Sequence, residues 1–228
     1  MQGLKHLFGY RVRAKDEDIG KVEDFFVDDR SWSVRYLLVR TGGYFSGASA
    51  VVPVECLGSP DTAGHVLPVR FGKDQLDAVA QRNIQPVAAE MKALLNALYG
   101  KSDDRRDRGF IRVGCPTADG AEDASSLRSV REVAAYQLET RDGACGLCTD
   151  FLADFDDWTV PYLVVNTKEW RPHGHVLVPT TWVTEICWKD MEIEVSASRD
   201  KIQHAQRFDP ASHEFRPGGS ARPLHKSA

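Results

Sequence analysis

The chain has 228 residues, and its 33 acidic residues against 29 Lys and Arg give a formal net charge of −4. Binding that rests on the phosphate backbone requires a basic excess, so we expect no direct nucleic-acid contact. No apolar run approaches the roughly 20 residues of a membrane-spanning helix, and the first residues lack a signal-peptide core. The five cysteines have no framework spacing and suit a reducing compartment. We expect a cytoplasmic protein, either free or held at a membrane surface by a partner.

One pattern of residues occurs twice, 126 positions apart. Residues 19–41 read IGKVEDFFVDDRSWSVRYLLVRT and residues 145–167 read CGLCTDFLADFDDWTVPYLVVNT, with ten identities in 23 positions and no gap. The repeated positions include Gly20 and Gly146, Asp24 and Asp150, Asp28 and Asp154, Trp32 and Trp158, and Tyr36 and Tyr162. So many agreements at one fixed spacing predict a tandem duplication, in which these residues form the core and the turns of each copy.

The first copy predicts a series of short strands. β-branched and aromatic residues alternate or cluster, with turn residues between them, over residues 11–13, 20–27, 33–40, 50–54 and 65–69. Short strands at such close spacing indicate a small barrel or sandwich rather than alternating strands and helices. We therefore predict a mainly β fold built from two small barrels.

Each copy is followed by a helical pattern. Asp74 is a suitable N-cap for an amphipathic helix that ends at Gly100, and Asp200 is predicted to cap a shorter helix in the second copy. The predicted domains are a first barrel with its helix, a mixed-charge linker, a second barrel and a disordered tail. Their predicted bounds are 1–100, 101–127, 128–207 and 208–228.

The repeated residues resemble the PRC-barrel domain. The resemblance rests on Gly20-Lys21-Val22-Glu23-Asp24, Val27-Asp28, the run from Trp32 to Val39, and Val51-Val52-Pro53. It covers residues 4–77 and, more weakly, 129–207. The family is named for the cytoplasmic part of the photosynthetic reaction centre H subunit and also occurs in ribosome maturation factors. The resemblance implies a small, bent β-barrel in each half that acts as a docking or regulatory module.

Three tryptophans occur only in the second copy. Trp170, Trp182 and Trp188 align with the smaller residues Tyr44, Cys56 and Thr62. Aromatic side chains are enriched at the centres of protein interfaces. We therefore predict that these tryptophans form a surface that contacts a protein partner.

Histidines and carboxylates offer weaker candidate sites. His173 and His175 lie on one face of an extended segment and could bind a metal, although a solvated hairpin is the alternative. The pairs Asp28-Asp29 and Asp156-Asp157 could hold calcium or act as an acid/base pair. We favour a structural role for them, because short carboxylates accept hydrogen bonds from the backbone of their own turns.

Two other patterns are predicted to be structural. Cys145 and Cys148 match C-x-x-C but align with strand positions of the first copy, where residues three apart point to opposite faces unless a bulge at Gly146 brings them together. Thioredoxin-like chemistry also requires a helix N-terminus, which this segment lacks. Trp32 and Tyr36 are four residues apart, so we expect both rings on one face of the strand. There they could stack on a ligand or, as we favour, cover the core.

We expect a non-catalytic protein-interaction or adaptor module without a cofactor. No motif places a nucleophile beside a base, so we do not expect an enzyme. A protein partner is expected, and a homo-oligomer is compatible with the sequence. One alternative is a small-molecule or metal-binding sensor that uses His173 and His175. Another is an accessory factor for ribosome assembly or for a photosynthetic membrane complex.

Overall fold

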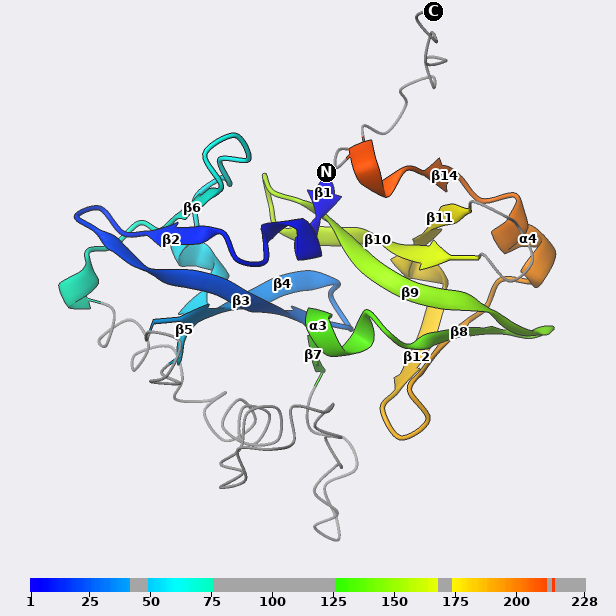
Figure 1. The fold of residues 1–228 in the computed structure, drawn as a ribbon. Coiled ribbons are helices and arrows are strands. Elements are labelled where there is room, and N and C mark those ends of the chain that lie inside the picture. Colours follow the sequence, from blue (N-terminus) through cyan, green and yellow to red (C-terminus); the bar gives the residue numbers. More distant parts are fainter. Residues whose placement is uncertain (42–48, 76–125, 168–173, 213–214, 216–228) are drawn as a thin grey trace, which may run out of the picture.

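The computed structural model describes residues 1–41, 49–75, 126–167, 174–212 and 215 (Figure 1). Within these residues, fourteen strands form one sheet, and the helices are short. The prediction of a mainly β fold is confirmed. No helix in the described ranges is long and apolar enough to cross a bilayer.

The first half of the chain contains the strands that the sequence predicts, within two residues at each end. Its elements are β1 (Gln2–Gly3), η1 (Leu4–Leu7), β2 (Arg11–Arg13), β3 (Asp18–Asp28), β4 (Ser33–Arg40), β5 (Ser49–Pro53), η2 (Val54–Cys56), β6 (Val66–Pro68) and η3 (Lys73–Gln75). Strands β3 and β4 form the long antiparallel hairpin of this half, and β2 pairs with both β3 and β6.

The second half repeats this order with small additions. Its elements are β7 (Leu127–Ser129), α3 (Val130–Val133), β8 (Gln137–Thr140), β9 (Gly143–Asp154), β10 (Thr159–Asn166), β11 (His175–Pro179), η4 (Thr180–Trp182), β12 (Val183–Cys187), β13 (Glu192–Val195), α4 (Arg199–Gln203), β14 (Arg207–Phe208) and η5 (Pro210–Ser212). The long hairpin here is β9–β10, and β8 pairs with both β9 and β13.

The two halves meet at reciprocal contacts between β4 and β10. Ser33 is opposite Thr159, exactly 126 residues later in the chain. The backbone N–H of Val34 donates to the carbonyl of Trp158 over 2.8 Å, and the N–H of Val160 donates to the carbonyl of Trp32 over 2.7 Å. Each bond has its equivalent in the other half, so the junction has a local two-fold relation.

The first strand of each half pairs with the other half. Strand β1 pairs with β9, where Gln2 is opposite Ala153, and β7 pairs with β3, where Val27 is opposite Arg128. The sheet runs β12-β13-β8-β9-β10-β4-β3-β2-β6, and its end strands do not pair with each other. The prediction of two separate closed barrels is therefore not supported, because these short exchanged strands join the halves into one open sheet.

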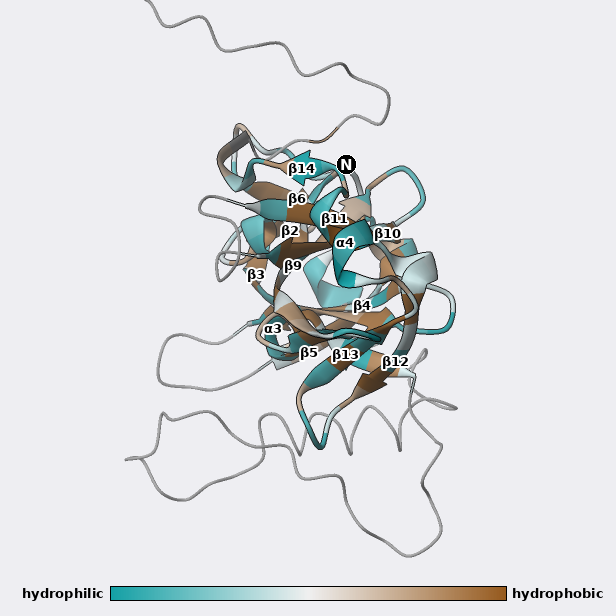
Figure 2. Ribbon diagram, turned by 90° about the vertical axis from the view of Figure 1, so that its right-hand side faces the viewer, coloured by the Kyte–Doolittle hydropathy of each residue, from teal (hydrophilic) through white to brown (hydrophobic). Residues whose placement is uncertain are grey.

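One apolar core extends through both halves. Its large side chains include Phe25 and Phe151, both fully buried. Trp158 packs 6.0 Å from the ring of Phe25, and Trp32 packs 6.5 Å from that of Phe151, so each tryptophan contacts the phenylalanine of the other half. Figure 2 shows hydrophobic stretches along the strands and hydrophilic ones in the connecting turns. Burying these aromatic rings stabilises the junction of the halves.

The prediction that Trp32 and Tyr36 share one face of a strand is wrong. Trp32 lies in the turn before β4 with a φ of 50°, and Trp158 has a φ of 58° in the equivalent turn. Trp32 packs against the main core, whereas Tyr36 belongs to a separate outer cluster. The left-handed turn residue and a register shift between β3 and β4 break the alternation on which the prediction relied.

The helix after the second half, α4, begins two residues earlier than predicted. Its N-cap is Ser198, whose hydroxyl accepts from the N–H of Lys201, and Asp200 lies in the first turn. In the first half Asp74 lies in η3. The predicted helix up to Gly100 and most of the predicted linker fall outside the described residues.

Part of the predicted disordered tail packs on the second half. Strand β14 pairs with β11, with Phe208 opposite His175. Phe215 is buried against Leu152, Val164 and Leu177, and its backbone exchanges two hydrogen bonds with Met1. The apolar side chains of β9, β10 and β11 that point away from the main core explain why these aromatic residues are held there.

Candidate functional site

Of the three tryptophans predicted to form an interaction surface, Trp182 and Trp188 are described, and both are half-buried. Trp182 packs against the main core, and the ammonium nitrogen of Lys201 lies 4.1 Å from the centre of its ring. Trp188 packs against the outer cluster of the first half, with the guanidinium of Arg128 4.4 Å from its ring. Trp170 lies outside the described residues. The rings therefore contact different clusters, and each has a cation over one face.

His175 begins β11 and lines a cavity of about 170 Å³ together with His6, Thr149 and Asp150. His6 Nε2 lies 2.9 Å from the hydroxyl of Tyr10. His173 falls outside the described residues. Within the described ranges, no three His, Cys, Asp or Glu side chains are placed to hold a metal ion.

Of the paired carboxylates between the hairpin strands, Asp28 and Asp157 bind the backbone of their own turns, whereas Asp29 forms an ion pair with Arg128 of the other half over 2.6 Å. Asp28 Oδ1 accepts the N–H of Arg30 over 2.9 Å, and Asp154 Oδ1 accepts the N–H of Asp156 over 3.1 Å. Asp157 Oδ1 accepts both the N–H and the hydroxyl of Thr159. These are the local bonds of short carboxylates in turns.

The repeated aspartates of β3 and β9 join the halves. Asp24 is fully buried and accepts the hydroxyl of Ser129 and the N–H of Arg131, both from the start of α3. In the equivalent contact, Asp150 is half-buried and accepts the N–H of Lys5 from η1. Each carboxylate thus satisfies backbone donors at the start of a helix from the other half.

Burial changes the acidity of both carboxyls. Loss of solvent raises the pKa of Asp24 to about 6, although Ser129 and backbone N–H groups oppose the shift. Loss of solvent likewise raises the pKa of Asp150 to about 6. These groups therefore change charge near neutral pH while they hold the contact between the halves.

The two cysteines of β9 both point into the core. Cys145 and Cys148 are fully buried and free, and the predicted divergence of the two thiols is wrong. Gly146 lies between them with a φ of 130°, which breaks the alternation of the strand. Burial raises the pKa of Cys145 to about 12 and that of Cys148 further, so neither thiol has the acidity of a redox-active cysteine.

An apolar surface lies on the second half. Leu147 and Met191 are the two large hydrophobic side chains exposed among the described residues, at 46% and 52%. Leu147 is opposite Gln137 in the β8–β9 pair, and the N–H of Gln137 donates to the carbonyl of Met191. We call Leu147, Gln137 and Met191 the apolar patch.

Acidic side chains flank the apolar patch. Glu192 is opposite Gln137, and Glu194 is opposite Glu139, in the parallel pair of β13 and β8. The three glutamates, Glu139, Glu192 and Glu194, are called the acidic rim. They line an open hollow of about 610 Å³ together with Thr140, Arg141, Thr184, Val195 and Ser196. An apolar centre with a charged edge is the usual composition of a protein-binding surface.

Sequence reasoning did not single out Leu147 or Met191. A signal was present, because at the 126-residue spacing Leu147 aligns with Lys21 and Met191 with His65. Exposed apolar residues that replace polar ones in an otherwise similar copy mark a difference in surface rather than in core.

Comparison with known families identifies the first half of the chain. Residues 3–76 match the PRC-barrel domain, as the resemblance implied, while no curated protein matches the chain. The matched segment extends from β1 to η3, and it includes Asp24 and the β3–β4 hairpin. The chain therefore contains a PRC-barrel domain in its first half.

Proposed function

We propose that this protein is a non-catalytic protein-interaction or adaptor module that docks on a larger assembly through the apolar patch. The exposure of Leu147 and Met191 beside the acidic rim carries this proposal. Solvent-exposed apolar side chains grouped at one place are typical of binding surfaces. The docking and regulatory roles of PRC-barrel domains agree with it.

The buried polar groups support a structural rather than a catalytic use. Asp24 and Asp150 already accept backbone and hydroxyl donors. The thiols of Cys145 and Cys148 are buried, with raised pKa values. These two carboxylates and two thiols are thus part of the packing and hydrogen bonding that hold the fold.

The second half is, in this proposal, a diverged copy of the PRC-barrel domain. The equal spacing of β4 and β10, the parallel pairs β2–β6 and β8–β13, and the exchanged strands β1 and β7 support a tandem duplication. Duplication leaves one copy free to change its surface, which accounts for an apolar patch on one half alone.

Capture of partners from the native host tests the proposal. The full chain is compared with the double variant Leu147→Lys, Met191→His, which introduces the residues that occupy the equivalent positions of the first half. Arg35→Gln, Glu55→Gln, which alters two exposed side chains away from the apolar patch, is the matched control. A partner retained by the full chain and the control but lost by the patch variant supports the proposal, and equal capture by all three overturns it. Ribosomal or photosynthetic partners would identify an accessory role.

The cavity at His175 favours a second candidate function, a small-molecule or metal sensor. Two imidazoles and the hydroxyl and carboxyl of Thr149 and Asp150 line it, and such convergent polar groups can orient a small ligand. Elemental analysis and thermal shift with zinc, nickel and small carboxylic acids test this function. Stabilisation that His175→Ala abolishes would support it, and no response would remove it.

A further inference from the structure

The first half carries a basic row where the second half carries the apolar patch. Lys21 is opposite Arg11 in the β2–β3 pair, and the N–H of Arg11 donates to the carbonyl of His65 over 3.0 Å. All three side chains are exposed. The bond from Arg11 to His65 is the equivalent of the bond from Gln137 to Met191 in the apolar patch. His65 and Met191 also have similar φ values of 51° and 56°. The two surfaces therefore share one backbone shape and differ in their side chains.

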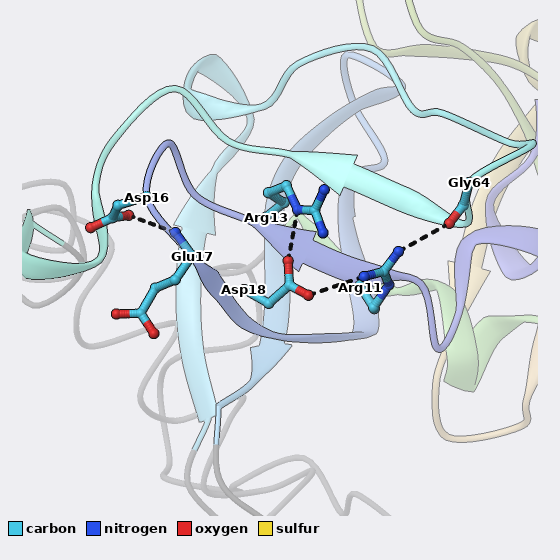
Figure 3. Close-up of polar contacts among 6 residues, drawn as sticks. All are labelled: Arg11, Arg13, Asp16, Glu17, Asp18 and Gly64. Atoms are coloured by element: carbon cyan, nitrogen blue, oxygen red, sulfur yellow. Dashed lines mark hydrogen bonds and ion pairs between the residues drawn. The ribbon is translucent and has the colours of Figure 1, made fainter.

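Arginines extend the basic row along β2. Arg11 Nη1 and Arg13 Nε donate to the two oxygens of Asp18 over 3.2 and 2.8 Å (Figure 3). Asp18 therefore holds both guanidinium groups side by side. Among the described residues, Arg13 donates a hydrogen bond through Nε alone, and its side chain is 51% exposed. Its two terminal nitrogens are therefore available to a partner. These nitrogens are suited to bidentate bonds with a carboxylate.

We infer that a second copy of this chain is the partner of the apolar patch, and that it docks through its basic row. This inference rests on the proposed function and names its partner. The carboxylates of the acidic rim would pair with Arg11 and Arg13, as their charges are opposite and both sets lie on exposed strands. The aliphatic stems of Lys21 and Arg11 would cover Leu147 and Met191, as long basic side chains cover apolar surface elsewhere.

The position of the two surfaces determines the kind of assembly. The basic row lies on β2, β3 and the turn before β6. The patch and rim lie on β8, β9, β13 and the turn before β13, towards the opposite end of the sheet (Figure 1). The contact joins unlike surfaces and leaves one of each kind free after every addition. Such contacts produce chains that grow with concentration rather than a closed symmetric dimer.

Sedimentation of the purified full chain tests the inference. Mass is measured against protein concentration at low and high salt for three samples. The first is the unaltered chain, the second is Leu147→Lys, Met191→His, and the third is Arg11→Gln, Arg13→Glu. Each variant takes residues that the fold already carries in the other half, so loss of folding is controlled, and circular dichroism checks it.

The unaltered chain is expected to associate and to do so about ten-fold more weakly at high salt. Each variant alone should stay monomeric, because it lacks one of the two surfaces. Their mixture should form a one-to-one dimer and grow no further, since one variant retains the basic row and the other the patch.

Two results would overturn the inference. One is a monomeric unaltered chain across the whole concentration range. The other is association of the unaltered chain without a dimer in the mixture of variants, which would place the contact elsewhere. If the chain is monomeric yet host partners still depend on Leu147 and Met191, the inference fails while the proposed function stands.

Discussion

Replacing the buried Asp24 by asparagine should remove a large part of the pH dependence of stability. The asparagine keeps an oxygen for the N–H groups of Phe25 and Arg131, and its amide can donate to the hydroxyl of Ser129. The bonds at the start of α3 are thus retained, whereas the titrating group is lost. The substitution separates the charge of this carboxyl from its hydrogen bonds.

The magnitude follows from the shift in pKa. Burial raises the pKa of Asp24 from 3.8 to about 6, which corresponds to about 3 kcal/mol between the fully protonated and fully ionised limits. Because the folded protein binds this proton more tightly than the unfolded chain, the stabilisation is complete below pH 3.8 and is lost as the pH rises through 6. Between pH 5 and 7.5 the loss amounts to about 1.4 kcal/mol.

Urea unfolding at intervals of pH measures this effect. Between pH 5 and 7.5, the free energy of unfolding should fall by about 1.4 kcal/mol more for the unaltered protein than for Asp24→Asn. Asp150→Asn should show an effect of the same sign and of similar size, because burial raises the pKa of Asp150 from 3.8 to about 6 as well. Asp24→Ala, which removes both the titrating group and the acceptor, should flatten the pH profile like Asp24→Asn and should cost about 3 kcal/mol at pH 5, falling by about 1.4 kcal/mol towards pH 7.5. Parallel pH profiles for the unaltered protein and Asp24→Asn would refute the argument, since the carboxyl would then titrate normally.

Three other substitutions or probes test the packing. Gly146→Ala should lower the free energy of unfolding by more than about 2 kcal/mol, because the added Cβ would clash with the backbone oxygen of Asn166 in β10. Gly143→Ala is the control and should cost less, since its Cβ would meet nothing within 4 Å. Equal losses of stability in urea unfolding would contradict this packing. Phe215→Ala should cost about 3 kcal/mol by loss of a buried ring, and an unchanged melting temperature would show that the ring is not seated on β9, β10 and β11. Maleimide at pH 7.5 should modify Cys187 at least about ten-fold faster than the buried thiols of β9. Peptide mass spectrometry measures the rate at each cysteine, and faster reaction in β9 would mean that the strand opens.

The apolar patch was hidden in the sequence for a physical reason. A single leucine or methionine in a strand is predicted to lie in the core, because apolar residues usually do. Alternation corrects such a prediction only where the backbone of the strand is regular. Gly146 breaks that regularity in β9, so Cys145 and Cys148 turn inward and Leu147 outward. The identity of the neighbouring strands, which place Gln137 between Leu147 and Met191, depends on long-range pairing.

The sequence by itself determined the β character of the chain, the ranges of its main strands and the turn role of carboxylates such as Asp28. These features depend on residues close together in the chain, so local spacing and propensity are sufficient to predict them. Only the tertiary structure decided that β1 and β7 exchange between the halves and that Asp24 and Asp150 hold them together. Strands of two or three residues carry no periodic signal, and a buried carboxylate finds its donors more than 100 residues away, where local patterns hold no information.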